Sequence, residues 1–69
     1  MRLESCIETI ILEKGYLKKH IAKEVGVTPA QLSNWIKMNN FPTADKLFLL
    51  AKVLNVKVDD LYQEIKEEV

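Results

Sequence analysis

Apolar residues recur at helical spacing along most of the 69-residue chain, and no stretch shows the alternation that predicts a strand. Over residues 3–14 they fall at positions i, i+3, i+4, i+7 and i+8, which share one face of a helix. These residues are Leu3, Cys6, Ile7, Ile10 and Ile11. Similar stripes predict helices over residues 18–25, 29–38 and 44–54, and a last helix that begins near residue 58. The pattern therefore predicts an all-α fold, a compact five-helix domain.

Local signals mark where these helices begin and end. Gly15 and Gly26 are placed to end the first and second helices, because glycine readily takes the left-handed backbone found there. Thr28 and Thr43 are good N-caps for the third and fourth helices. Leu17 stands where the second helix begins and is a poor cap, so we expect packing alone to hold that end.

Residues 17–38 have the features of a helix-turn-helix that reads DNA. The small side chain of Ala22 lets two helices pack closely, and Gly26 sets the turn between them. The third helix then offers short amides and hydroxyls to a groove. Its exposed positions are expected to be Ala30, Gln31, Ser33, Asn34 and Lys37.

The formal net charge is +0 at pH 7, but the charge is unevenly distributed. Residues 14–37 hold five lysines and one glutamate, whereas acidic residues outnumber basic ones on both sides. The positive charge is therefore concentrated on the predicted helix-turn-helix, as DNA binding favours. An ordinary solvated lysine face is the alternative interpretation.

Length and composition indicate one domain, residues 1–69. There is no long apolar run and no signal-peptide pattern, and the single cysteine, Cys6, cannot form an internal disulfide. We therefore expect a cytoplasmic protein in which Cys6 is a buried small hydrophobe rather than a reactive thiol.

The sequence offers no recognisable catalytic constellation. His20 has no second histidine or nearby cysteine with which to share a metal, and no serine or cysteine partner at a known spacing. We expect it to be an exposed helix residue. The prediction is a protein that is not an enzyme and has no cofactor, metal or small-molecule ligand.

The chain resembles the Cro and phage-repressor class of helix-turn-helix proteins, often called Xre-type, over about residues 7–62. No single residue is diagnostic, and the joint pattern carries the resemblance. It consists of Ile21-Ala22, Gly26-Val27-Thr28, Leu32-Ser33, Pro42-Thr43, Leu50-Ala51, Leu54-Asn55-Val56 and Asp59-Asp60-Leu61. The resemblance implies a lambda-repressor-like fold whose third helix lies in the major groove of double-stranded DNA.

The resemblance also implies which residues contact DNA. The base-reading positions hold Pro29, Ala30, Gln31 and Asn34. The positions that usually hold phosphates lie at the start of the second helix, on the third, and in the loop before the fourth. They hold Lys18, Lys19, Thr28, Ser33, Lys37, Asn39, Asn40 and Thr43. Gln31 and Ser33 could serve in either role.

Side-chain chemistry narrows the expected base preference. Asn34 can pair bidentately with adenine, and Gln31 can do so if it reaches. Pro29 and Ala30 can contact only apolar surface, such as a thymine methyl. Because the third helix has no arginine, we expect a site that leans to A·T pairs, although Lys37 could still reach a guanine. The alternative is that both amides are plain solvated surface.

The chain departs from the family's usual pattern at five positions. They are Leu17 and Lys57 in place of caps, Lys18 in place of glutamine, Ile36 in place of an acidic residue, and Met38 in place of glycine. Trp35 is expected in the core. Ile36 either enlarges the core or forms a contact surface with Trp35.

The expected function is sequence-specific DNA binding by a small dimeric transcriptional repressor of phage or mobile-element type. We expect a homodimer interface on the last helix, at Tyr62, Ile65 and Val69, because these residues exceed what so small a core needs. The alternative is a protein-interaction module on the same fold, with weak or no DNA binding. Neutral net charge and the missing caps favour that alternative, whereas the lysine-rich helix-turn-helix favours DNA binding.

Overall fold

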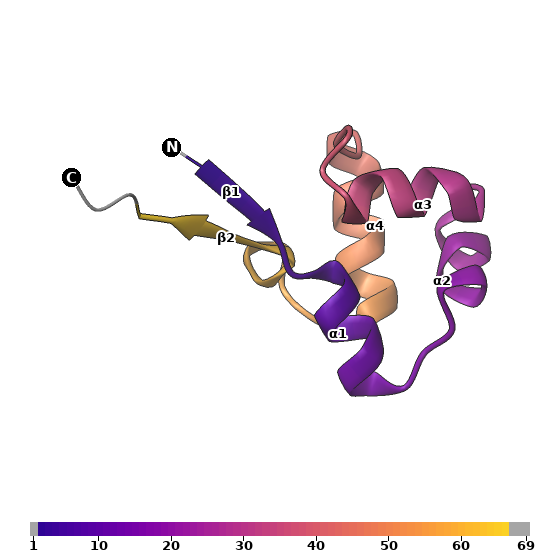
Figure 1. Cartoon of the computed structure of the whole chain (residues 1–69). Coiled ribbons are helices and arrows are strands. Elements are labelled where there is room, and N and C mark those ends of the chain that lie inside the picture. Colours follow the sequence, from indigo (N-terminus) through magenta and orange to yellow (C-terminus); the bar gives the residue numbers. More distant parts are fainter. Residues whose placement is uncertain (1, 67–69) are drawn as a thin grey trace.

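A computed structural model describes residues 2–66, in which four α-helices form one body and two strands form a ribbon beside it (Figure 1). The order of elements is β1 (Arg2–Ser5), α1 (Ile7–Lys14), α2 (Lys18–Val25), α3 (Pro29–Ile36), α4 (Ala44–Leu54), the 3₁₀ helix η1 (Val58–Leu61) and β2 (Tyr62–Ile65). The helices α2 and α3 pack on each other, and α2 also packs on α4.

The core is built from the inner faces of the four α-helices and closed by one residue of η1. Each core residue is at most 3% exposed: Ile7, Ile11, Ile21, Ala22, Val25, Leu32, Trp35, Leu50, Ala51, Leu54 and Leu61. The apolar stripes of the four α-helices are therefore the buried faces. Trp35 lies in the core, as predicted, and Ile36 packs against it, so Ile36 enlarges the core.

Each of the four α-helices is followed within two residues by a residue in the left-handed backbone conformation. These residues are Gly15 (φ 72°), Gly26 (φ 85°), Met38 (φ 65°) and Asn55 (φ 58°). The next N–H then reaches back five residues to a helix carbonyl; at α3, Asn39 N donates to Asn34 O at 2.9 Å. This is the Schellman arrangement. The predicted ends at Gly15 and Gly26 are confirmed, and Leu17 makes no side-chain cap to α2, as expected.

Two predictions at the ends of the chain are wrong. Arg2–Ser5 is strand β1, so the first helix begins at Ile7 rather than at residue 3. The last predicted helix is only the short η1, and strand β2 follows it. Within residues 2–66 the fold is therefore mostly helical rather than all-α, with four α-helices rather than five.

Pairing between the two ends of the chain overrides the local periodicity. The strands are antiparallel, with Leu3 opposite Glu64 and Glu4 opposite Gln63. Gln63 Nε2 donates to Glu4 Oε2 at 2.8 Å, across 59 residues of sequence. Cys6 N–H donates to the Leu61 carbonyl at 2.8 Å and joins the ribbon to the helices. A periodicity read over a short window carries no information on such distant partners.

The prediction that Cys6 is buried is wrong, because the residue is half-buried.

Among residues 2–66, no helix has the length and apolar character that a membrane crossing requires.

Candidate nucleic-acid interface

The helices α2 and α3 and the turn between them form the predicted helix-turn-helix (Figure 1). Ala22 is fully buried, so the helices approach each other without a large side chain between them. Val27, in the turn, packs against the core. From α4, Lys46 Nζ donates to the Val25 carbonyl at 3.2 Å, at the C-terminal end of α2, where a positive charge is favourable.

This contact between α4 and α2 was not predicted from the sequence. Lys46 and Val25 are 21 residues apart, and a lysine in the first turn of a helix carries no local signal for such a partner. The contact ties the end of α2 to α4 and so helps to fix the turn that sets the direction of α3.

Thr28 fixes where α3 begins. Its Oγ1 accepts a hydrogen bond from the Gln31 N–H at 3.1 Å, and Pro29 occupies the first helical position. The predicted N-cap is therefore confirmed. Since the Thr28 hydroxyl acts here as an acceptor and the residue is exposed, its O–H is free to donate to a phosphate.

The predicted DNA-contacting residues of α3 lie on its outer surface. Leu32 and Trp35 take the inner face and are buried. Pro29, Ala30 and Lys37 are exposed, while three polar residues are half-buried: Gln31, Ser33 and Asn34. Partial burial restricts these three side chains, which favours a defined hydrogen-bonding direction over free rotation.

The structure brings together two residues to which the sequence assigned separate roles. Asn39 Nδ2 donates to Asn34 Oδ1 at 3.2 Å. Asn39, a predicted phosphate contact, is therefore hydrogen-bonded to Asn34, a predicted base-reading residue. The backbone bond from Asn39 N to Asn34 O at 2.9 Å sets the same two residues side by side. Asn39 and its neighbour Asn40 are both exposed.

The predicted phosphate contacts at the start of α2 differ in their surroundings. Lys18 Nζ lies 2.5 Å from Glu8 Oε1, an acidic partner from α1 that sequence reasoning missed. Lys19 is exposed and has no ion pair within the described residues. His20 is exposed, as expected, with Nε2 3.8 Å from Glu24 Oε1.

Thr43 stands at the N-cap of α4, but its side chain does not make the predicted capping bond. Its Oγ1 instead donates to Asp45 Oδ1 at 2.5 Å. This hydrogen bond, followed by one from the Lys46 backbone N–H, holds the pKa of Asp45 below its ordinary value of 3.8. The Asp45 carboxylate therefore competes for the helix N-terminus that a phosphate was expected to use.

The predicted dimer residues lie on a strand rather than on a helix. Tyr62 and Ile65 are both half-buried in β2, and Val69 falls outside the described residues. The Tyr62 ring packs against exposed Phe41, with ring centroids 6.0 Å apart, and burial raises the pKa of Tyr62.

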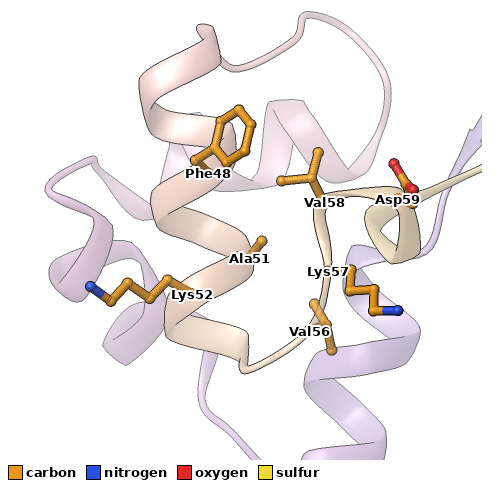
Figure 2. A pocket seen from close by; sticks show the side chains of 7 residues that line it. All are labelled: Phe48, Ala51, Lys52, Val56, Lys57, Val58 and Asp59. Atoms are coloured by element: carbon orange, nitrogen blue, oxygen red, sulfur yellow. The ribbon is translucent and has the colours of Figure 1, made fainter.

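A groove of about 640 Å³ lies between α4 and the segment that follows it (Figure 2). It is lined by Phe48, Ala51, Lys52, Val56, Lys57, Val58 and Asp59. Phe48 is 67% exposed at its rim. None of the predicted DNA-contacting residues lines this groove, so it is a surface separate from theirs.

Comparison with known proteins places this arrangement in a family. A family model described as helix-turn-helix matches residues 7–61. No curated protein matches the chain. A crystal structure of a putative DNA-binding protein from Bacteroides fragilis has a TM-score of 0.81 at 24% identity, covering 90% of this chain and 100% of that one. The P22 c2 repressor, solved with a synthetic operator, has a TM-score of 0.72 at 24% identity, covering 77% of this chain and 80% of that one. At these identities the two structures show the shared fold alone, whereas the family model covers most of the sequence. The chain belongs to the helix-turn-helix family of the Cro and Xre type.

Proposed function

We propose that this protein binds double-stranded DNA sequence-specifically and acts as a small repressor-like transcriptional regulator. The observation that carries the proposal is the construction of α3. Its start is fixed by the Thr28 cap, its inner face is anchored by Leu32 and Trp35, and its outer face offers the amides of Gln31 and Asn34. A helix held in this way can present base-reading groups in the major groove.

In this proposal, phosphate contacts and base contacts have different roles. Lys19 and Lys37 are exposed and supply charge to phosphates, which raises affinity for any sequence. Asn34 and Gln31 reach base edges and supply discrimination. Exposed Pro29 and Ala30 favour thymine methyl groups, so the half-site leans to A·T pairs where they contact it.

The regulator acts as a homodimer in this proposal. A two-fold pair would place two α3 helices about 34 Å apart along the DNA, one turn of the duplex. Support comes from apolar surface on and beside the ribbon: Leu3 is 38% exposed and Phe41 57% exposed, next to half-buried Tyr62 and Ile65. Sedimentation of the wild type and of Ile65→Lys checks this: the variant is expected to be the lighter species.

A protein-interaction module is the second candidate, and two observations favour it. Glu8 neutralises Lys18, and the Asp45 carboxylate sits at the α4 N-terminus. Both place negative charge among the predicted phosphate contacts. DNA binding is therefore expected to be weaker than the number of lysines alone would indicate.

Binding to a mixed-sequence duplex across a salt series separates the two candidates. A DNA binder loses affinity linearly in log–log coordinates, and each lost phosphate contact flattens the slope by about 0.9. We expect that flattening for Lys19→Ala and for Lys37→Ala. Lys52→Ala, on the separate α4 groove, is the matched control and should change nothing. Weak binding with no effect of these lysines would favour the interaction module.

A further inference from the structure

We propose that Asn39 is a specificity-determining residue, which orients the Asn34 amide so that Asn34 reads a hydrogen-bond acceptor on the base edge. This inference rests on the proposed function and names what one of its base-reading residues recognises. A side-chain amide has two different ends, an oxygen that accepts and an NH₂ group that donates. Whichever end is held inside the protein, the other is left for DNA.

The structure holds the oxygen end of Asn34. Asn39 Nδ2 donates to Asn34 Oδ1 at 3.2 Å, so both N–H donors of Asn34 remain without a partner in the described residues. In the major groove, guanine presents two adjacent acceptors, O6 and N7, to a donor. Adenine presents the acceptor N7 beside its N6 donor, and the Asn34 oxygen can still accept from that donor, because an amide oxygen has two lone pairs. A purine is therefore the base that best matches the amide as it is held, since either purine gives it two contacts and a pyrimidine gives it one.

The backbone supports this orientation by holding Asn39 next to Asn34. Met38 takes the left-handed conformation at φ 65°, and the Asn39 N–H then bonds to the Asn34 carbonyl at 2.9 Å. The two Cα atoms are fixed relative to each other before the side chains meet. Asn34 is also half-buried, so it has fewer rotamers to lose when the amides pair. Preorganisation of this kind strengthens discrimination without any added contact to DNA.

Two substitutions at Asn39 should change the base preference of Asn34 in different ways. Asn39→Ala releases the Asn34 amide, so the preference at its base pair should broaden to admit pyrimidines. Asn39→Asp supplies only acceptors, so Asn34 must turn its NH₂ inward and its oxygen outward. The preference should then move to a base with a donor, adenine or cytosine. The added negative charge should also lower affinity, but equally for all sequences.

Neighbouring Asn40 supplies the matched control. It lies in the same exposed loop, and its side chain makes no hydrogen bond within the described residues. Asn40→Asp adds the same charge one residue away, so it should reproduce the uniform loss of affinity without a change of base preference. Asn34→Ala identifies the base pair in question, because preference should be lost there alone.

The experiment is selection of random duplexes on the wild type and on these four variants, followed by binding to single-base variants of the wild-type site. The proposal predicts a purine at the base pair marked by Asn34→Ala, with at least about fivefold discrimination against pyrimidines. That discrimination should be lost in Asn39→Ala, and Asn39→Asp should admit cytosine. The side-chain NH₂ resonances of Asn34, measured by NMR without DNA, should shift in Asn39→Asp. An enriched wild-type site whose preference is unchanged by both Asn39 variants would overturn this inference alone. No enriched wild-type site would overturn the proposed function and this inference with it.

Discussion

The ammonium of Lys18 lies 2.5 Å from the carboxylate of Glu8, so a predicted phosphate contact on α2 is already paired with an acid on α1. Both side chains are about half exposed, and an ion pair in such a position adds little to stability. Its larger effect is expected on DNA binding, because the pair carries no net charge toward a phosphate.

Replacing Glu8 with glutamine should strengthen DNA binding. The variant removes one negative charge beside Lys18 and leaves the lysine free, so the log–log salt slope should steepen by up to about 0.9. Fluorescence anisotropy across a salt series measures both effects. Glu13→Gln, on the same helix and also exposed, is the control for charge alone. Equal slopes for Glu8→Gln and wild type would place Lys18 away from the DNA.

Replacing Met38 with glycine should stabilise the protein. Its φ of 65° costs a residue with a Cβ about 1 kcal/mol, and glycine takes this conformation without that cost. We expect Met38→Gly to raise the free energy of unfolding by up to about that amount in urea denaturation. Lys37→Gly is the matched control: Lys37 has φ −80°, so glycine there should destabilise. A loss of stability in Met38→Gly would mean that the methionine side chain contributes more by packing than its backbone costs.

The hydrogen bond from Thr43 should be visible in the titration of Asp45. Thr43→Val keeps the shape and removes the donor, so the pKa of Asp45 should rise toward 3.8 in an NMR titration. A carboxyl whose folded pKa lies below its unfolded value contributes stability above the unfolded pKa, and this contribution is lost as pH falls through the folded pKa. Asp45→Asn should therefore show a smaller loss of stability than wild type as pH falls below about 3.8. An unchanged Asp45 pKa in Thr43→Val would contradict the assigned cause.

The contact from Lys46 to α2 should contribute to stability. Lys46→Met keeps most of the apolar stem and removes the donor to the Val25 carbonyl, so we expect a loss of about 1 kcal/mol in the free energy of unfolding. Lys52→Met, exposed on the same helix, should cost less than half of that. Chemical denaturation of both variants makes the comparison. Equal losses in the free energy of unfolding would show that the hydrogen bond from Lys46 to the Val25 carbonyl does not stabilise the protein.

Sequence periodicity predicted the parts of the fold that depend on neighbours along the chain. The buried faces of α2 and α3, the glycine at the end of α2 and the cap at Thr28 all follow from residues within one or two turns. The same stripe continued through Leu3 and through Ile65, where it predicted helices and was wrong. There the backbone of β1 pairs with β2 at the other end of the chain, and a local pattern cannot report that pairing.

The candidate site shows the same division. The outward positions of α3 could be assigned from the spacing of Leu32 and Trp35. The partners of these site residues could not be assigned from the sequence, because they lie outside the same helix. Glu8, for example, lies ten residues before Lys18 and on another helix. Asn39 lies only five residues after Asn34, yet its contact depends on the left-handed turn at Met38, where a methionine gives no such signal.

Selection of random duplexes on the purified protein, followed by binding to the enriched site across a salt series, tests the central claim most directly. The account predicts an enriched palindrome with half-sites about one duplex turn apart, bound with a steep negative slope of log affinity against log salt. Asn34→Ala should lose about 1–3 kcal/mol of discrimination at one base pair of each half-site and leave the others unchanged. No enriched sequence, with weak binding even at low salt, would contradict the account and assign this fold to recognition of another protein.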